Sequence, residues 1–254
     1  YGVGKGTQPD VLRAQVALSK MIDQELKLLQ QREAVQARIN TLLNDPADSP
    51  LGKAVVMEPE PWTGKLQTLI QRADSSSPVL AAWKTAVKQS GQKVDLALKD
   101  RYPDFSVGVA YTQRNELQNG MQGYDFVSAM FNVKIPLFIN KKQNKKVQET
   151  QIRQSSIEYR YQNVANSIEQ KLQQSLTDLE KNQRLLELYR TGIIPQAEES
   201  LESSIAGYQN DKVDFLSLLD SELTLFQFRL DYHRFLADYH KAIADIEALT
   251  GTEF

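Results

Sequence analysis

The chain contains one helical pattern twice, and the two copies stand 207 residues apart without a gap. At this spacing Tyr1 coincides with Tyr208, Lys5 with Lys212, Leu12 with Leu219, Leu18 with Leu225, Leu29 with Leu236, Ala37 with Ala244, Ile39 with Ile246 and Leu42 with Leu249. The segments 1–44 and 208–251 are therefore predicted to be copies of one element. The spacing is too long for a short solenoid repeat and indicates a duplicated unit. We expect a substantial N-terminal part to precede Tyr1 in the natural protein, because the pattern opens in its middle and without Met.

Apolar residues recur at helical spacing over most of the chain. They predict helices at 9–43, 66–72, 78–101, 140–206 with an interruption at Gly192 and Pro195, and 212–249. The last helix contains spacings of three and four without a slip, which is typical of a coiled-coil seam. The seam consists of Leu225, Phe228, Tyr232, Phe235, Tyr239, Ala242, Ile246 and Leu249.

The period changes to two residues in 104–112 and 126–136, which are predicted to be strands joined by the polar loop 113–125. Strands of about nine to eleven residues can cross a bilayer at a tilt. The alternation places one apolar set on a single face, which we expect to face lipid: Phe105, Val107, Val109, Tyr111, Val127, Ala129, Phe131, Val133 and Ile135. A lone hairpin is not stable in water, so we expect it to join strands from elsewhere.

Composition excludes several functions. The absence of cysteine excludes thiol catalysis, disulfides and cysteine-ligated zinc. The net charge of −2 gives no general attraction to nucleic acid. No run of apolar residues approaches the ~20 that a transmembrane helix needs.

Five ordered motifs resemble those of the TolC-like outer-membrane efflux factors, especially the heavy-metal branch (CzcC/CusC-like). They are YGVGKGTQPDVLRAQ at 1–15, YPDFSVGV at 102–109, IPLF at 135–138, AGYQNDKVDFLSLLD at 206–220 and IEALTG at 246–251. The resemblance extends over essentially the whole chain. The family's first hairpin and its neighbouring helices are absent, so this chain alone cannot build a complete family protomer.

The resemblance implies a mainly α fold, in which long antiparallel coiled-coil helices form a periplasmic α-barrel and a transmembrane β-hairpin contributes to an oligomeric β-barrel. In that scheme 1–43 and 208–250 are helices from tip to equator, and 44–76 is an equatorial linker. Segments 77–102 and 139–207 are helices between barrel, equator and tip, and 103–138 is the hairpin.

The same resemblance implies a passive exit duct in the outer membrane of a Gram-negative bacterium, extending into the periplasm. The implied partners are two further protomers in a trimer, a periplasmic adaptor, an inner-membrane pump and outer-membrane lipid, with no nucleic acid. The implied cargo includes heavy-metal ions, and no cofactor is expected.

The first turns of the two repeat copies are the candidate entrance. The family closes its periplasmic tip with polar links and acidic rings, and the matching candidates are Asp10, Arg13, Lys212, Asp214, Ser217 and Asp220. The spacing pairs Asp10 with Ser217 and Arg13 with Asp220, so a serine replaces one acid of a double ring. These charges also fit ordinary helix starts, where acids favour the N-terminal dipole.

No catalytic or metal constellation is visible. The only histidines, His233 and His240, stand seven residues apart on one predicted helix. Their side chains are then ~10 Å apart, which is too far to share one ion. Two alternatives to a channel remain: a periplasmic helical-hairpin structural or adaptor protein, whose strands belong to a water-soluble sandwich, and, more distantly, an enzyme.

Overall fold

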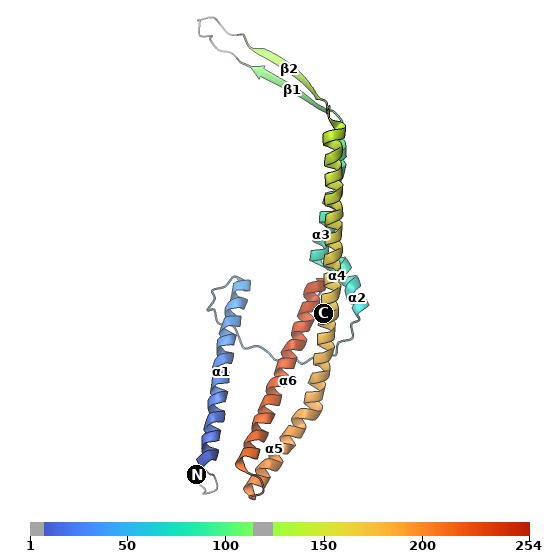
Figure 1. Ribbon diagram of the computed structural model, residues 1–254. Helices are drawn as coiled ribbons and strands as arrows, with labels where there is room; N and C mark the ends of the chain where they lie inside the picture. Colours follow the sequence, from blue (N-terminus) through green and yellow to red (C-terminus); the bar gives the residue numbers. More distant parts are fainter. Residues whose placement is uncertain (1–7, 114–123) are drawn as a thin grey trace. The chain divides into compact units, whose positions relative to one another are not determined.

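The computed structural model describes residues 8–113 and 124–254 (Figure 1). The helices are α1 (Gln8–Leu43), α2 (Leu66–Ser76), α3 (Pro78–Lys99), α4 (Asn144–Leu188), α5 (Ile194–Gln209) and α6 (Phe215–Thr250), the strands are β1 (Asp104–Thr112) and β2 (Phe126–Lys134), and the π-helical turns are η1 (Ile139–Gln143) and η2 (Tyr189–Ile193). The chain divides into two compact units. Unit 1 comprises the described parts of 1–63 and 175–244, and unit 2 those of 64–174 and 245–254.

The predicted mainly helical chain with one hairpin is confirmed over the described residues. The first seven residues of the repeat and most of the predicted loop, 114–123, lie outside them. No described helix has the length and apolar character that crossing a bilayer would require.

Two predicted helix ends were wrong. Helix α2 continues to Ser76, because its end is set by Ser77, whose extended backbone (ψ 119°) precedes Pro78. The residue before a proline is disfavoured in helical conformation, and Pro78 then starts α3. Helix α3 itself ends at Lys99, two residues before the predicted end.

The predicted interruption near Gly192 and Pro195 is instead a widened helical turn. The turn η2 connects α4 to α5, and the amide of Ile194 donates to the carbonyl of Tyr189, five residues earlier. Pro195 lies in the first turn of α5 and has no amide proton to donate. A single π turn lets the helix absorb this missing donor and continue.

The two copies of the repeat end in the same way. The last residues of α1 and α6, Leu43 and Thr250, are 207 positions apart, as the sequence spacing predicts. The next residue has a positive φ in both copies, 61° at Asn44 and 71° at Gly251. This left-handed conformation commonly ends a helix. The structure therefore confirms the duplication over the described residues.

Side chains at matching positions hold the chain as it leaves each helix. In the first copy, Asn40 Nδ2 donates to the carbonyls of Ala47 (3.0 Å) and Ser49 (2.8 Å). In the second, Glu247 Oε1 accepts a hydrogen bond from the amide of Phe254 at 2.8 Å. Asn40 and Glu247 coincide at the repeat spacing, as do Ala47 and Phe254. Both copies therefore link the same two positions, through a side-chain donor in the first copy and a side-chain acceptor in the second.

The two copies differ in burial. All eight members of the predicted α6 seam are buried or half-buried, which confirms the seam. In α1 only Asn40 is buried, and apolar residues such as Leu12 and Leu42 are 54% and 80% exposed. Within the described chain, the apolar face of α1 is therefore largely uncovered.

Unit 1 is held together by aromatic packing and by the linker. The ring of Tyr189 packs edge-on against Phe228 and Phe235, with centroids 5.9 and 5.1 Å apart. Tyr239 is fully buried, and its hydroxyl donates to the carbonyl of Glu60 in the linker. The linker 44–65 is thus fixed to α6 as well as to the end of α1.

Unit 2 is built around α2, α3 and the N-terminal part of α4 (Figure 1). Leu69, Leu80 and Leu172 are among its most deeply buried side chains. The C-terminal residues close this unit, because the Arg72 guanidinium lies 4.7 Å from the centre of the Phe254 ring. The hairpin extends from this unit through α3 and η1.

Gly251 is predicted to tolerate no side chain. A Cβ there would lie 2.6 Å from the Ser76 carbonyl oxygen, and φ is +71°. Gly251→Ala should therefore lower the free energy of unfolding by about 2 kcal/mol or more. Gly91→Ala is the matched control, since its Cβ would make only an ordinary 3.9 Å contact with Gln154. It should raise stability by about 0.4–1 kcal/mol. Denaturant unfolding followed by circular dichroism measures both, and equal effects would contradict this role of Gly251.

Candidate functional site

The strands β1 and β2 pair so that their apolar side chains lie on one face. The antiparallel register sets Phe105 opposite Val133 and Val107 opposite Phe131. It continues with Val109 opposite Ala129 and Tyr111 opposite Val127. Directly opposite residues point to the same side of a sheet, so eight of the nine predicted apolar residues form one continuous surface.

The ninth residue, Ile135, is the exception. Strand β2 ends at Lys134, so the predicted extension to residue 136 was wrong. The next pair in register would join Ile135 to Pro103, which has no amide proton for the ladder. Ile135 therefore follows the strand without a partner in β1.

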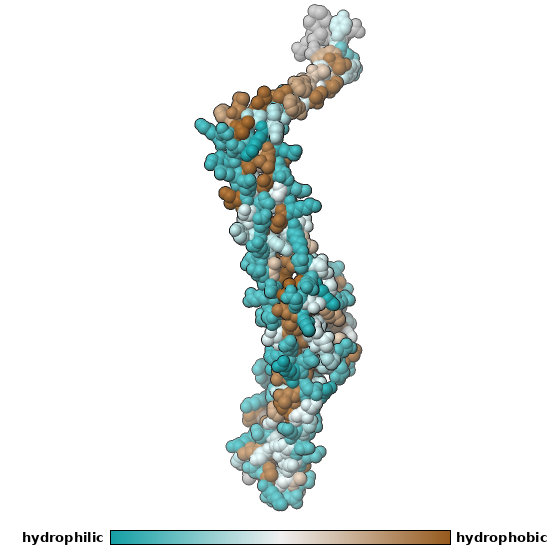
Figure 2. Space-filling view, turned by 90° about the vertical axis from the view of Figure 1, so that its right-hand side faces the viewer, coloured by the Kyte–Doolittle hydropathy of each residue, from teal (hydrophilic) through white to brown (hydrophobic). Residues whose placement is uncertain are grey.

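This apolar face is exposed to solvent in the described chain. Val107 and Val109 are each 74% exposed, and Phe131 is 69% exposed. The stacked rings of Phe105 and Phe131, 6.2 Å apart, cover little of it. Hydrophobic surface dominates the hairpin in the upper part of Figure 2. Leaving a valine or phenylalanine side chain in water costs about 1.5–3 kcal/mol relative to burial, so the summed cost for this face is comparable to the whole stability of a domain.

The opposite face of the hairpin is mostly polar or small. Its register pairs are Asp104 with Lys134, Ser106 with Asn132, Gly108 with Met130, Ala110 with Ser128 and Thr112 with Phe126. Each strand has nine residues and so spans about 30 Å. Among the described residues the sheet has two strands only, which leaves one backbone edge of each strand unpaired.

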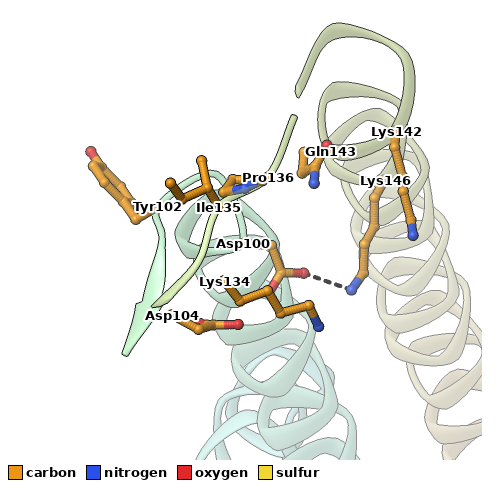
Figure 3. A pocket seen from close by; sticks show the side chains of 9 residues that line it. All are labelled: Asp100, Tyr102, Asp104, Lys134, Ile135, Pro136, Lys142, Gln143 and Lys146. Atoms are coloured by element: carbon orange, nitrogen blue, oxygen red, sulfur yellow. Dashed lines mark hydrogen bonds and ion pairs between the residues drawn. The ribbon is translucent and has the colours of Figure 1, made fainter. Parts of the chain in front are cut away.

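A small pocket lies where the hairpin joins the helices (Figure 3). It has a volume of about 300 Å³ and is lined by Asp100, Tyr102, Asp104, Lys134, Ile135, Pro136, Lys142, Gln143 and Lys146. Lys146 Nζ lies 2.6 Å from Asp100 Oδ2. This hydrogen bond raises the pKa of Lys146 above its ordinary value. The pair fastens the end of α3 to the start of α4.

The turn between α5 and α6 carries several of the predicted entrance residues. Asp211 has a φ of 57°, and the amide of Lys212 donates to the Gly207 carbonyl at 2.8 Å. Val213 then packs so closely that a Cβ on Gly207 would lie 2.5 Å from its Cγ2. The helix α6 consequently begins at Phe215, three residues after the predicted start.

Asp214 caps this helix. Its Oδ1 accepts a hydrogen bond from the Ser217 amide at 2.7 Å, the usual partner of an N-cap side chain. Hydrogen bonds from the side chain and then the backbone of Ser217 lower the pKa of Asp214, and the charge of Arg13 adds a smaller effect. An ordinary helix-start role is therefore established for Asp214 by its geometry.

The structure brings some of the other entrance candidates together. The charge of Arg13 on α1 contributes to the lowered pKa of Asp214 at the start of α6, and both residues belong to unit 1 (Figure 1). No ion pair joins Arg13 to Asp220 within the described part of the chain. Asp10 lies in the first turn of α1, and the Ser217 carbonyl accepts a hydrogen bond from Ser221.

The histidines make separate contacts. His240 Nε2 is 3.1 Å from the carbonyl oxygen of Met57, whereas the ring of His233 packs edge-on against neighbouring Tyr232. In residues 8–113 and 124–254, no three His, Cys, Asp or Glu side chains gather as a metal site would require.

The pocket below the hairpin was missed by sequence reasoning. The ion pair between Lys146 and Asp100 joins residues 46 positions apart. The periodicity of a helix or a strand does not predict contacts between such distant residues. The lysine-rich segment 140–146 was visible in the sequence, but its position beside Asp100 and Asp104 comes only from the fold.

Residues 69–252 match a protein family described as outer membrane efflux protein. The match covers well over half of the 254 residues. The cobalt-zinc-cadmium resistance protein CzcC of Cupriavidus metallidurans is 23% identical over 164 residues, which represent 65% of this chain and 38% of CzcC.

Solved structures share the fold. The outer membrane protein VceC of Vibrio cholerae has a TM-score of 0.80 at 16% identity, with 100% of this chain and 61% of VceC covered. The CmeC outer membrane channel of Campylobacter jejuni has a TM-score of 0.83 at 12% identity, with 98% of this chain and 54% of CmeC covered. The predicted fold class is thus confirmed, and the chain spans less than two thirds of each of these relatives.

The cap of α6 gives a local prediction. Asp214→Ala should speed hydrogen exchange of the Ser217 amide roughly fivefold or more at pH 7, because that amide loses its acceptor. Since the folded pKa is lowered from 3.8, the cap's contribution is present above that pH and is lost as pH falls through the lower folded value. Asp220→Ala is the control and should leave the Ser217 amide unchanged. Equal exchange in both variants at pH 7 would exclude the cap.

Proposed function

The chain belongs to the outer membrane efflux protein family, and we propose that it forms part of an outer-membrane exit duct for a tripartite efflux system. The duct extends from the outer membrane of a Gram-negative bacterium into the periplasm. It conducts solutes passively and catalyses no reaction. An inner-membrane pump and a periplasmic adaptor deliver the solutes.

The apolar face of the hairpin carries this proposal. Eight side chains, paired in register, present an unbroken apolar surface that water disfavours. The opposite face carries serine, asparagine, threonine and glycine. A barrel wall needs this division, with apolar residues toward lipid and polar residues toward an aqueous lumen.

The open strand edges support an oligomeric duct. In the bilayer core an unpaired amide or carbonyl costs several kcal/mol, so a hairpin there requires neighbours on both sides. A ring of such hairpins from several protomers closes the sheet and removes the edges. A trimer is the assembly that the family resemblance implies.

The cargo that we propose is heavy-metal ions. CzcC is named as a cobalt-zinc-cadmium resistance protein and matches 65% of this chain. A duct need not bind its cargo tightly, so no clustered ligand set is required along the helices described here. Measuring which ions the purified duct passes in planar bilayers would decide between metal and organic cargo.

A periplasmic structural or adaptor protein is the alternative. Its strands would belong to a water-soluble sandwich, and the protein would stay monodisperse without detergent. The exposed apolar face predicts the reverse: removal of detergent should aggregate the natively produced protein.

The entrance of the duct is proposed to lie at the first turns of α1 and α6. Arg13, Asp214 and Asp220 bring both signs of charge to this end of unit 1. Exposed pairs contribute only about 0–1 kcal/mol each, so several must act together to keep an entrance closed. Asp10, Lys212 and Ser217 complete the proposed set.

Replacing Arg13 and Asp220 together by alanine should raise single-channel conductance of the natively produced protein in planar bilayers, because fewer links then hold the entrance. The free energy of unfolding should change by less than about 1 kcal/mol per lost pair. Lys27 and Asp23 provide the control, since they form an exposed ion pair of 2.6 Å within α1. Their double replacement should leave conductance unchanged. Unchanged conductance in the Arg13 and Asp220 variant would place the gate elsewhere.

A further inference from the structure

The pocket below the hairpin has an excess of positive charge. Three lysines and two aspartates line it, so the formal net charge of its lining is +1. One lysine, Lys146, is neutralised by Asp100 at 2.6 Å. The side-chain ammonium groups of Lys134 and Lys142 have no ion-pair or hydrogen-bond partner among the described residues. The pocket therefore offers two free ammonium groups beside one free carboxylate, Asp104.

The backbone adds to this charge. The turn η1 begins directly after Phe138, whose carbonyl accepts the amides of Lys141 and Lys142 at 3.2 and 2.9 Å. Helical backbone continues from there into α4, so the positive end of a long helix dipole lies at the pocket. Lysine side chains and helix start together favour an anion.

One buried polar atom of the pocket lacks a partner. Gln143 Oε1 is inaccessible to solvent and accepts no hydrogen bond in the described structure. Buried acceptors are nearly always paired. Gln143 lines the pocket, so a rotation of its amide would let a ligand that carries a hydrogen-bond donor satisfy this atom.

Apolar side chains border the same pocket. Ile135 is 62% exposed, and Leu137 and Phe138 directly after the pocket-lining Pro136 are 81% and 68% exposed. Figure 3 shows the side chain of Ile135 and the ring of Tyr102 on one side of the pocket, with the lysine ammonium groups on the other. A charged pocket beside an apolar border suits an amphipathic ligand better than a free ion.

We propose that this pocket binds the phosphate diester of a membrane phospholipid, with Lys134 and Lys142 as its cationic partners. The inference rests on the proposed function, because it requires the hairpin to lie in a membrane and the pocket at the interface. The headgroup phosphate is held by the two ammonium groups, and the acyl chains run along Ile135 toward the apolar face of the hairpin. A donor on the headgroup, such as the ammonium of phosphatidylethanolamine, lies beside Asp104 and reaches Gln143 Oε1 once the Gln143 amide rotates toward the pocket.

Such a site would fix the depth of the hairpin in the bilayer. Phosphate groups lie at a defined level of the membrane, and the lysines lie at the point where strand becomes helix. The bound headgroup would therefore hold the junction of β2 and η1 at the interface.

Native mass spectrometry of the natively produced protein in detergent tests the proposal, with phosphatidylethanolamine, phosphatidylcholine and inorganic phosphate as probes. Lys134→Gln with Lys142→Gln should weaken phosphatidylethanolamine binding about tenfold or more, since two charge-assisted hydrogen bonds are lost. Lys88→Gln with Lys171→Gln is the matched control on α3 and α4 and should stay within about twofold of the unchanged protein. Phosphatidylcholine, which has no N–H donor, should bind more weakly than phosphatidylethanolamine, and Gln143→Leu should reduce that preference.

The lipid site and the duct are tested separately. Equal lipid binding by both double variants overturns the pocket proposal, and so does displacement of lipid by inorganic phosphate, which would indicate a free-phosphate site. Conductance in planar bilayers is measured on the same preparations. Preserved conductance with unchanged lipid binding leaves the duct intact and removes only the lipid site, whereas no conductance in the unchanged protein contradicts the duct itself.

Discussion

A two-stranded ribbon has backbone edges that need partners and, in this chain, an apolar face that needs cover. Neither need is met within the described residues, because β1 and β2 pair only with each other. Water would form hydrogen bonds with the strand edges but would leave the apolar face exposed. Lipid would cover the apolar face but would leave the edge amides and carbonyls without hydrogen bonds. A closed sheet in a membrane satisfies both. The rest of the proposed architecture, including oligomerisation and an enclosed lumen, follows from this conflict.

The two helices of the repeat also differ in how much of their apolar surface is buried. Helices α1 and α6 are copies of one element and end at equivalent residues, Asn44 and Gly251. Yet the α6 seam is buried or half-buried, whereas α1 buries only Asn40. One sequence pattern can thus be covered in one place and open in another, because burial depends on which neighbours are present. An uncovered copy is the arrangement expected of a wall element that packs against further helices.

Sequence periodicity predicted the helices, the hairpin face and the repeat because each reflects a local, regular arrangement of side chains. It failed where tertiary contacts or turn chemistry decide. The start of α6 depends on the left-handed Asp211 and on the cap by Asp214, and the widened turn at Pro195 keeps a helix continuous where proline suggested a break. The ion pair between Asp100 and Lys146 joins residues that are distant in the sequence, so no sequence motif predicted the pocket. The entrance residues were selected by resemblance, and their grouping in unit 1 supports that choice only in part.

In the proposed duct, one face of the hairpin lies against lipid and the other against water. Nitroxide labels placed singly along β1, from residue 105 to residue 111, report this directly in the natively produced protein reconstituted in bilayers. Oxygen, which partitions into lipid, should relax labels at odd positions most strongly, and a water-soluble nickel chelate should relax those at even positions. This two-residue period in opposite phase is the predicted result. Equal access of the nickel chelate to both sets would contradict a membrane-spanning hairpin.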